Sequence, residues 1–164
     1  MYKGKYAKYF TTDIREESTI PGVIEGPSFG LRGARQIPGV NANFGWILIT
    51  KPLFLDKVPH THYGDEYLFF LGGQIPDSFS TFSAEIDFYI GEEQEKYTIT
   101  EPTLIFIPKG LLHTPLNFRK INKPLLFGML LLTPRYTKIE NGKEISYDGP
   151  GVNGAPETID INRI

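Results

Sequence analysis

The chain has 164 residues, which suits one domain with a sizeable core, because domains commonly contain roughly 100 to 200 residues. Its formal charge of 17 minus 19, or -2, gives no basic field for nucleic acid or an anionic membrane, so we expect neither as a partner. The absence of cysteine excludes disulfides and cysteine-based metal sites. No apolar run approaches membrane-spanning length, and we expect a cytoplasmic protein.

Residues 1–43 show no sustained helical or strand periodicity and are punctuated by proline and glycine. We predict that they form an extended N-terminal arm with short strands, lying on the rest of the domain or on a partner subunit. The predicted core of the domain spans residues 44–133. All of these segments belong to a single domain, residues 1–164.

Residues 44–50 and 67–71 are predicted strands with apolar side chains on both faces. Leu68 and Phe70 fall on the same face as Glu66, and we expect them, together with Trp46, to point into the interior. A strand with one face in water would alternate with polar residues. The outer face is therefore expected to be covered by a second sheet or a second subunit.

The remaining segments also predict strands. Residues 84–100 alternate apolar and polar side chains around a turn, and residues 103–107 and 125–133 are apolar. Asn141-Gly142 suits the type I′ turn of a hairpin between residues 136–140 and 143–147, within a predicted C-terminal hairpin and tail at 134–164. Many short strands separated by turns, with no amphipathic helix, predict an all-β barrel or sandwich.

The chain has three histidines, and all lie in two short segments: His60 and His62 in the first and His113 in the second. His60 and His62 are two residues apart, so their side chains leave the same face of a strand, and Glu66 follows at an even spacing. A strand histidine is more often a surface or core residue than a ligand. The paired spacing, the carboxylate, the turn before His113 and the absence of other histidines together predict one divalent metal ion.

Asn117 lies four residues beyond His113, so we expect it to face the same interior. There it would support a metal ligand or cap a turn.

The two segments resemble the paired motifs of the cupin superfamily, G(X)5HXH(X)3,4E(X)6G and G(X)5PXG(X)2H(X)3N. The leading glycine of each motif is replaced, by Phe54 in the first and Pro102 in the second. The resemblance implies a cupin-type double-stranded β-helix, or jelly-roll barrel, and a set of four metal ligands. The matching residues are His60, His62, Glu66 and Gly73 in the first motif, and Pro108, Gly110, His113 and Asn117 in the second. The implied ligands are His60, His62, Glu66 and His113.

Three nitrogens and one oxygen would leave up to two positions open on an octahedral metal. We expect Fe, Mn, Ni, Co or Zn, of which Zn would use fewer ligands or a looser site. A divalent ion with one carboxylate keeps about one positive charge, which favours a small carboxylate, keto acid or enediol as ligand. We therefore predict a metal-dependent enzyme, either a dioxygenase or an isomerase or lyase. The alternative is a non-enzymatic module that binds or senses a small ligand or a metal.

The apolar strands and the N-terminal arm also predict a homodimer. In such a dimer the arm would add to the sheet of the neighbouring subunit and cover an edge that is otherwise exposed.

Overall fold

The structure is a computed structural model and describes residues 2–147, which form twelve strands and two short 3-10 helices. All strand pairs are antiparallel, so the predicted all-β architecture is confirmed. Among these residues no helix has the length and apolar character needed to cross a membrane. The elements are η1 (Ala7–Tyr9), β1 (Arg15–Glu16), β2 (Ile24–Arg32), η2 (Gly33–Arg35), β3 (Asn43–Ile49), β4 (Leu53–Leu55), β5 (Glu66–Gly72), β6 (Ala84–Ile90), β7 (Glu95–Ile99), β8 (Thr103–Ile107), β9 (His113–Ile121), β10 (Leu125–Leu131), β11 (Tyr136–Glu140) and β12 (Lys143–Tyr147).

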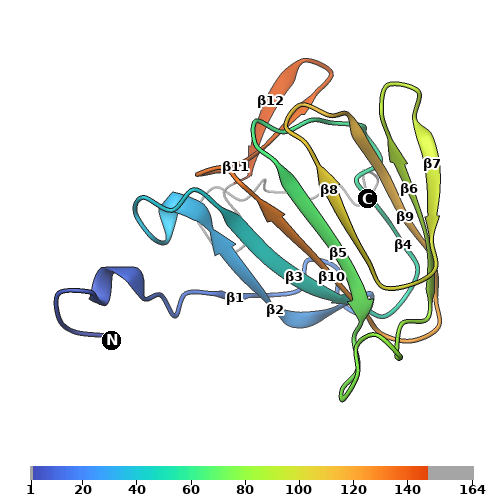
Figure 1. The fold of residues 1–164 in the computed structure, drawn as a ribbon. Coiled ribbons are helices and arrows are strands. Elements are labelled where there is room, and N and C mark those ends of the chain that lie inside the picture. Colours follow the sequence, from blue (N-terminus) through green and yellow to red (C-terminus); the bar gives the residue numbers. More distant parts are fainter. Residues whose placement is uncertain (1, 148–164) are drawn as a thin grey trace.

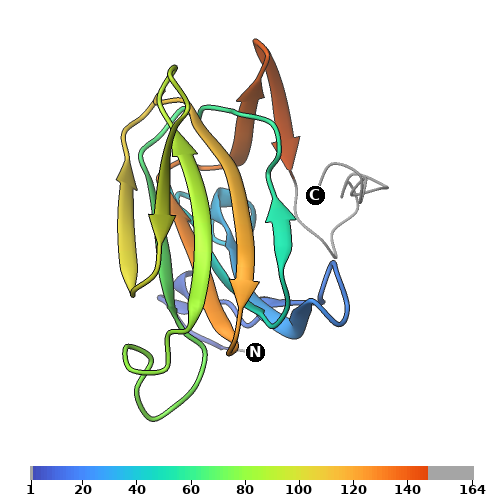
Figure 2. The ribbon, with the colours of Figure 1, turned by 90° about the vertical axis from the view of Figure 1, so that its right-hand side faces the viewer.

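Two sheets face each other and enclose the core (Figures 1 and 2). The larger has six strands in the order β1-β2-β3-β10-β5-β8, and the smaller has four in the order β4-β9-β6-β7. The hairpin β11–β12 forms a separate two-stranded sheet at one end of the pair (Figure 1). From β3 to β6, and again from β7 to β10, successive strands alternate between the two sheets, as in a jelly roll.

The core is built from the inward side chains of both sheets. On β5 the burial alternates strictly, so that Leu68 and Phe70 face inward beside Glu66, as predicted. Phe70 packs against Phe127 of β10 with ring centroids 5.1 Å apart, and Phe127 meets Phe118 of β9 at 5.3 Å. These aromatic contacts join the two sheets.

The prediction that Trp46 points inward is wrong. Ile49 of the same strand is fully buried, so β3 turns its odd-numbered residues to the core, and Trp46 is 37% exposed on the outer face. There its ring stacks on Phe29 of β2 at 4.3 Å. The outer face of the larger sheet is apolar but only partly covered, and at its β8 end Leu104 is 65% exposed and Phe106 48% exposed.

The segment predicted as an arm contributes a full strand to its own barrel. β2 is nine residues long and pairs with β3 of the same chain, with a register shift between Glu25 and Phe29. The residues before β1 run away from the sheet (Figure 1), and Tyr6 and Phe10 in this stretch are about 60% exposed. β2 therefore extends the larger sheet by one strand beyond the predicted core.

Candidate metal centre

His60 and His113 are held opposite each other by the backbone. The amide nitrogen of each donates to the carbonyl oxygen of the other, at 3.0 and 3.1 Å, which makes an isolated antiparallel bridge. His62 follows two residues after His60, and its carbonyl oxygen accepts a hydrogen bond from the amide of Gly110 at 3.1 Å. Gly110 has φ +79°, a conformation that favours glycine in the turn before His113. The two motif segments are thus tied together by main-chain hydrogen bonds.

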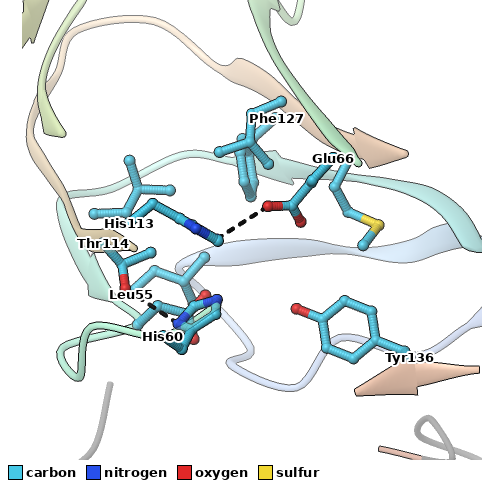
Figure 3. A pocket seen from close by; sticks show the side chains of 11 residues that line it. Leu55, His60, Glu66, His113, Thr114, Phe127 and Tyr136 are labelled. Atoms are coloured by element: carbon cyan, nitrogen blue, oxygen red, sulfur yellow. Dashed lines mark hydrogen bonds and ion pairs between the residues drawn. The ribbon is translucent and has the colours of Figure 1, made fainter. Parts of the chain in front are cut away.

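The four predicted site residues converge. One ring nitrogen from each of the three histidines lies within 4.8 Å of the corresponding nitrogens of the other two. Oε2 of Glu66, at the start of β5, lies 3.2 Å from Nε2 of His113 (Figure 3). The same oxygen lies 3.6 Å from Nε2 of His62. All four residues are at most 4% exposed. The structure therefore brings three imidazoles together at one buried point, with the Glu66 carboxylate beside two of them.

The outward nitrogen of each imidazole contacts a backbone carbonyl oxygen. Nδ1 lies 3.2 Å from Val58 O in His60, 2.6 Å from Thr137 O in His62 and 2.8 Å from Leu111 O in His113. A carbonyl oxygen only accepts, so we assign the proton to Nδ1, and Nε2 then carries a lone pair that faces the cluster. This pattern of support is typical of histidines that bind metals.

Two of these inward atoms, Nε2 of His62 and Nε2 of His113, are buried without a hydrogen-bond partner among the described residues. Most buried side-chain polar atoms are hydrogen-bonded, so each exception calls for a ligand or a cause. A metal ion bound at the cluster would satisfy both lone pairs at once. The residues present therefore fit a divalent metal, although this geometry does not select one element.

The electrostatics favour the neutral form of the imidazoles. Burial, together with the positive charge of Lys138, lowers the pKa of His60 to about 2. Burial also lowers the pKa of His62, and the nearby Glu66 carboxylate opposes this shift. Neutral imidazole is the form that coordinates metals, so these two side chains need no deprotonation at neutral pH.

The expectation that Asn117 faces the interior is wrong, because a β-bulge intervenes. His113 pairs with Ile90 of β6, and Leu116 pairs with Phe88 of β6. The chain thus advances three residues along β9 where it advances two along β6, so β9 carries one extra residue here. Thr114 in this bulge has φ +70°, which is rare for a β-branched residue. The extra residue reverses the alternation, so His113 and Leu116 are both buried, and Asn117 points to the outer face of the smaller sheet.

The hairpin β11–β12 was predicted from the sequence, but its role in the site was not. The carbonyl of Thr137 orients His62, and Thr61 and Ile139 exchange backbone hydrogen bonds at 2.9 and 3.1 Å. Lys138, 5% exposed, forms an ion pair with Asp56, which lies just after β4. No spacing in the sequence links residues 136–138 to the histidine motif. The one usable signal was that Tyr136 and Lys138 are two residues apart, so that their side chains leave the same face of the predicted strand.

A cavity of about 120 Å³ opens beside the cluster (Figure 3). His60, Glu66 and His113 line one side, and the hydroxyl end of Tyr136 faces them from β11. The volume is well below that of a drug-sized site, so only a small molecule fits. The rest of the lining consists of Leu55, Asp56, Leu68, Thr114, Leu116, Phe127 and Met129.

No protein-family model matches this sequence, and no curated protein matches it. Among solved structures, recombinant oxalate oxidase in complex with glycolate is 12% identical with a TM-score of 0.50, covering 85% of this chain and 63% of its own. The chain thus spans less than two thirds of that protein. Hazelnut (Corylus avellana) vicilin is 14% identical with a TM-score of 0.47, over 84% of this chain and 35% of its own. An uncharacterised double-stranded β-helix protein from Klebsiella pneumoniae is 10% identical with a TM-score of 0.47, over 77% of this chain and 85% of its own.

Proposed function

We propose that this chain, which has the cupin fold, binds one divalent transition metal through His60, His62, Glu66 and His113 and is a metal-dependent enzyme. Its substrate would be a small carboxylate, keto or enediol compound. The observation that carries the proposal is a pair of buried Nε2 atoms that have no hydrogen-bond partner within residues 2–147, each on an imidazole whose Nδ1 is already engaged. Oxalate oxidase has this fold and binds glycolate, a small hydroxycarboxylate, which supports the substrate class by analogy of fold.

When bound, a divalent metal supplies a Lewis-acid centre and, if it is iron, redox chemistry as well. The residues of the chain do the rest. The carbonyls of Val58, Thr137 and Leu111 hold the imidazole rings in orientation, and Glu66 contributes one negative charge. The nearby Asp56 carboxylate is balanced by Lys138, so about one positive charge would remain to attract an anionic ligand.

Ligand binding tests this proposal directly. The purified protein, loaded with Mn(II) or Fe(II), should melt at a higher temperature in the presence of a millimolar carboxylate such as glycolate or 2-oxobutyrate. A ligand at about 100 times its Kd should add about 2.7 kcal/mol to the free energy of unfolding. Acetamide, which has no negative charge, is the control ligand. No shift with any carboxylate or enediol would contradict the proposal.

Turnover separates the remaining alternatives. Oxygen consumption with the Fe(II)-loaded protein would identify a dioxygenase, whereas product formation without oxygen would identify an isomerase or lyase. Binding without turnover would favour the non-enzymatic module.

The homodimer is also part of the proposal. The partly exposed apolar face of the larger sheet, with Trp46, Leu104 and Phe106, supports a subunit contact, because exposed apolar patches of this kind are typical of interfaces. Light scattering at micromolar concentration should give twice the mass of one chain. Leu104→Lys should lower the measured mass toward that of a single chain. Ile75→Lys, at a 95% exposed position in the loop after β5, is the matched control and should leave the dimer intact. A wild-type monomer would contradict the predicted homodimer.

The cytoplasmic location of the protein also stays a prediction.

A further inference from the structure

We infer that Asp56, a residue of the cavity lining, selects the ligand: its carboxylate accepts a hydrogen bond from a hydroxyl group on that ligand. The ligand is then a small 2-hydroxycarboxylate, and the corresponding 2-oxo acid is disfavoured. This inference rests on the proposed function and narrows the substrate class given there to compounds that carry a hydroxyl group.

Asp56 reaches the cavity from the end of β4. Leu55, the last residue of that strand, pairs with Leu116 of β9, and both leucines line the cavity together with Asp56. Figure 3 shows Leu55 in this lining. Asp56 follows with φ +48°, a conformation that is uncommon outside glycine but that aspartate adopts more readily than most residues. Residues in such conformations cluster at active sites and ligand-binding sites.

The carboxylate of Asp56 lies near the histidine cluster and is ionised at neutral pH. Burial raises its pKa, whereas Lys138, His60 and His113 lower it, and the net pKa lies below the ordinary value. Electrostatic effects fall off with distance, so those of the two histidines place the carboxylate close to the cluster. An ionised carboxylate accepts hydrogen bonds and donates none.

One oxygen of this carboxylate is left for a ligand. Within residues 2–147 its one hydrogen-bond donor is Nζ of Lys138, which binds Oδ1. Two carboxylate oxygens offer about four acceptor sites, so Oδ2 keeps its capacity to accept. The side chain of Asp56 is 30% exposed, and the residue lines the cavity, so a small ligand there can reach it.

The other polar side chains of the lining, outside the four proposed metal ligands, do not make the same selection. The hydroxyl of Thr114 donates to the carbonyl oxygen of Val58 at 3.0 Å. A tyrosine hydroxyl both donates and accepts, so Tyr136 would not distinguish a hydroxyl from a carbonyl group. Asp56 is therefore the lining residue outside the metal ligands that accepts without donating.

A hydroxyl and a carbonyl group behave differently opposite an ionised carboxylate. The hydroxyl donates its hydrogen to Oδ2 of Asp56, whereas the carbonyl oxygen of a 2-oxo acid has only lone pairs and faces a negative charge. The keto ligand also displaces water and leaves the acceptor unpaired, and this is how a site built for a hydroxyl rejects the analogue that lacks it. Because the side chain is partly exposed, we expect a discrimination of about tenfold.

Lactate and pyruvate test this selection, because they share their skeleton and charge and differ only at C2. Isothermal titration calorimetry gives the Kd of each acid for Mn(II)-loaded wild type and for Asp56→Asn. The intrinsic affinity of the metal for each acid cancels when the ratio of the pyruvate Kd to the lactate Kd is compared between the two proteins. This ratio should fall about tenfold in Asp56→Asn, since an amide can turn an N–H toward the ligand.

Asp56→Asn is conservative for the fold. Asparagine also adopts positive φ readily, and its amide oxygen can still accept a hydrogen bond from Lys138. The metal content should match wild type, which a general disturbance of the site would not predict. Asp56→Asn combined with Lys138→Met leaves neither charge of the pair behind, and this double variant should show the same fall in the ratio.

Asp87→Asn is the matched control. Asp87 of β6 also pairs with a lysine, Lys96, at 3.4 Å, but it does not line the cavity. The ratio of the two Kd values should therefore stay at its wild-type value in this variant.

Two results would overturn the inference while leaving the proposed function intact. One is a ratio within about twofold of wild type in both Asp56→Asn and the double variant, and the other is an equal fall in Asp87→Asn. If wild type binds neither acid, the inference fails. The proposed function fails with it when glycolate and enediols also leave the melting temperature unchanged.

Discussion

His62→Ala should leave the purified protein with almost no bound metal, whereas wild type should carry close to one ion per chain. The substitution removes one of the two orphaned Nε2 atoms and also releases the carbonyl of Thr137. Even loss of a residue that only supports a metal ligand typically costs 10- to 100-fold in metal affinity, so loss of the ligand itself should cost more. Elemental analysis after gel filtration measures the effect, and Glu66→Ala should also lose metal.

Asn117→Ala is the control for these variants. Asn117 belongs to the same cupin-like motif as His113 but points away from the cluster because of the bulge at Thr114. Its alanine variant should therefore retain the wild-type metal content. Full retention of metal in both His62→Ala and Glu66→Ala would contradict the proposed centre.

Lys138→Met should lower the free energy of unfolding by about 1.5 to 3 kcal/mol, the usual range for a hydrogen-bonded charged group. Lys138 is 5% exposed and pairs with Asp56, whose side chain is 30% exposed, so removing the lysine leaves a partly buried carboxylate without this cation. Urea denaturation should be followed on metal-free protein, so that a change in metal affinity does not contribute. Asp56→Leu combined with Lys138→Met should recover much of the loss, because a buried pair is replaced by apolar groups.

The pH dependence of this loss has a defined sign. In wild type, burial raises the pKa of Asp56, but Lys138, together with smaller effects of His60 and His113, lowers it, and the net pKa is lowered. The carboxylate therefore contributes stability above its unfolded pKa of about 4, and this contribution is lost as the pH falls through the lower folded pKa. Without Lys138, burial should hold the folded pKa above the unfolded one, so the deficit of the variant should shrink as the pH falls.

Lys96→Met provides the matched control. Lys96 is about half exposed and pairs with Asp87 at 3.4 Å, so its loss should cost at most about 1 kcal/mol. A loss in Lys138→Met no larger than in Lys96→Met would contradict the importance of the buried pair.

The parts of the fold that depend on short-range patterns could be predicted from the sequence. Alternation on β5 placed Leu68 and Phe70 correctly, because every second residue of an unbroken strand points to the same face along its whole length. Asn141-Gly142 predicted the β11–β12 hairpin because few residues adopt positive φ at both turn positions, and both do here. The spacing of His60 and His62 likewise anticipated that both would join one cluster.

The errors arise where parity or proximity depends on tertiary structure. Counting from His113 to Asn117 assumes an unbroken strand, and a single bulged residue at Thr114 reverses the face. Trp46 was placed inward because both faces of β3 are apolar, so composition could not choose between them. Tyr136 and Lys138 lie more than seventy positions beyond His62, and only the folded hairpin brings them to the cavity.

The place of β10 in the larger sheet also constrains the order of events during synthesis. β10 lies between β3 and β5, pairing with both along its full length, although it is made long after them. Until residue 131 has left the ribosome, β3 and β5 each present an unpaired edge, and such edges promote association between chains. The carbonyl that orients His62 follows only at Thr137. Barrel closure and completion of the histidine cluster are thus among the last steps, and until then the exposed strand edges favour aggregation of the growing chain.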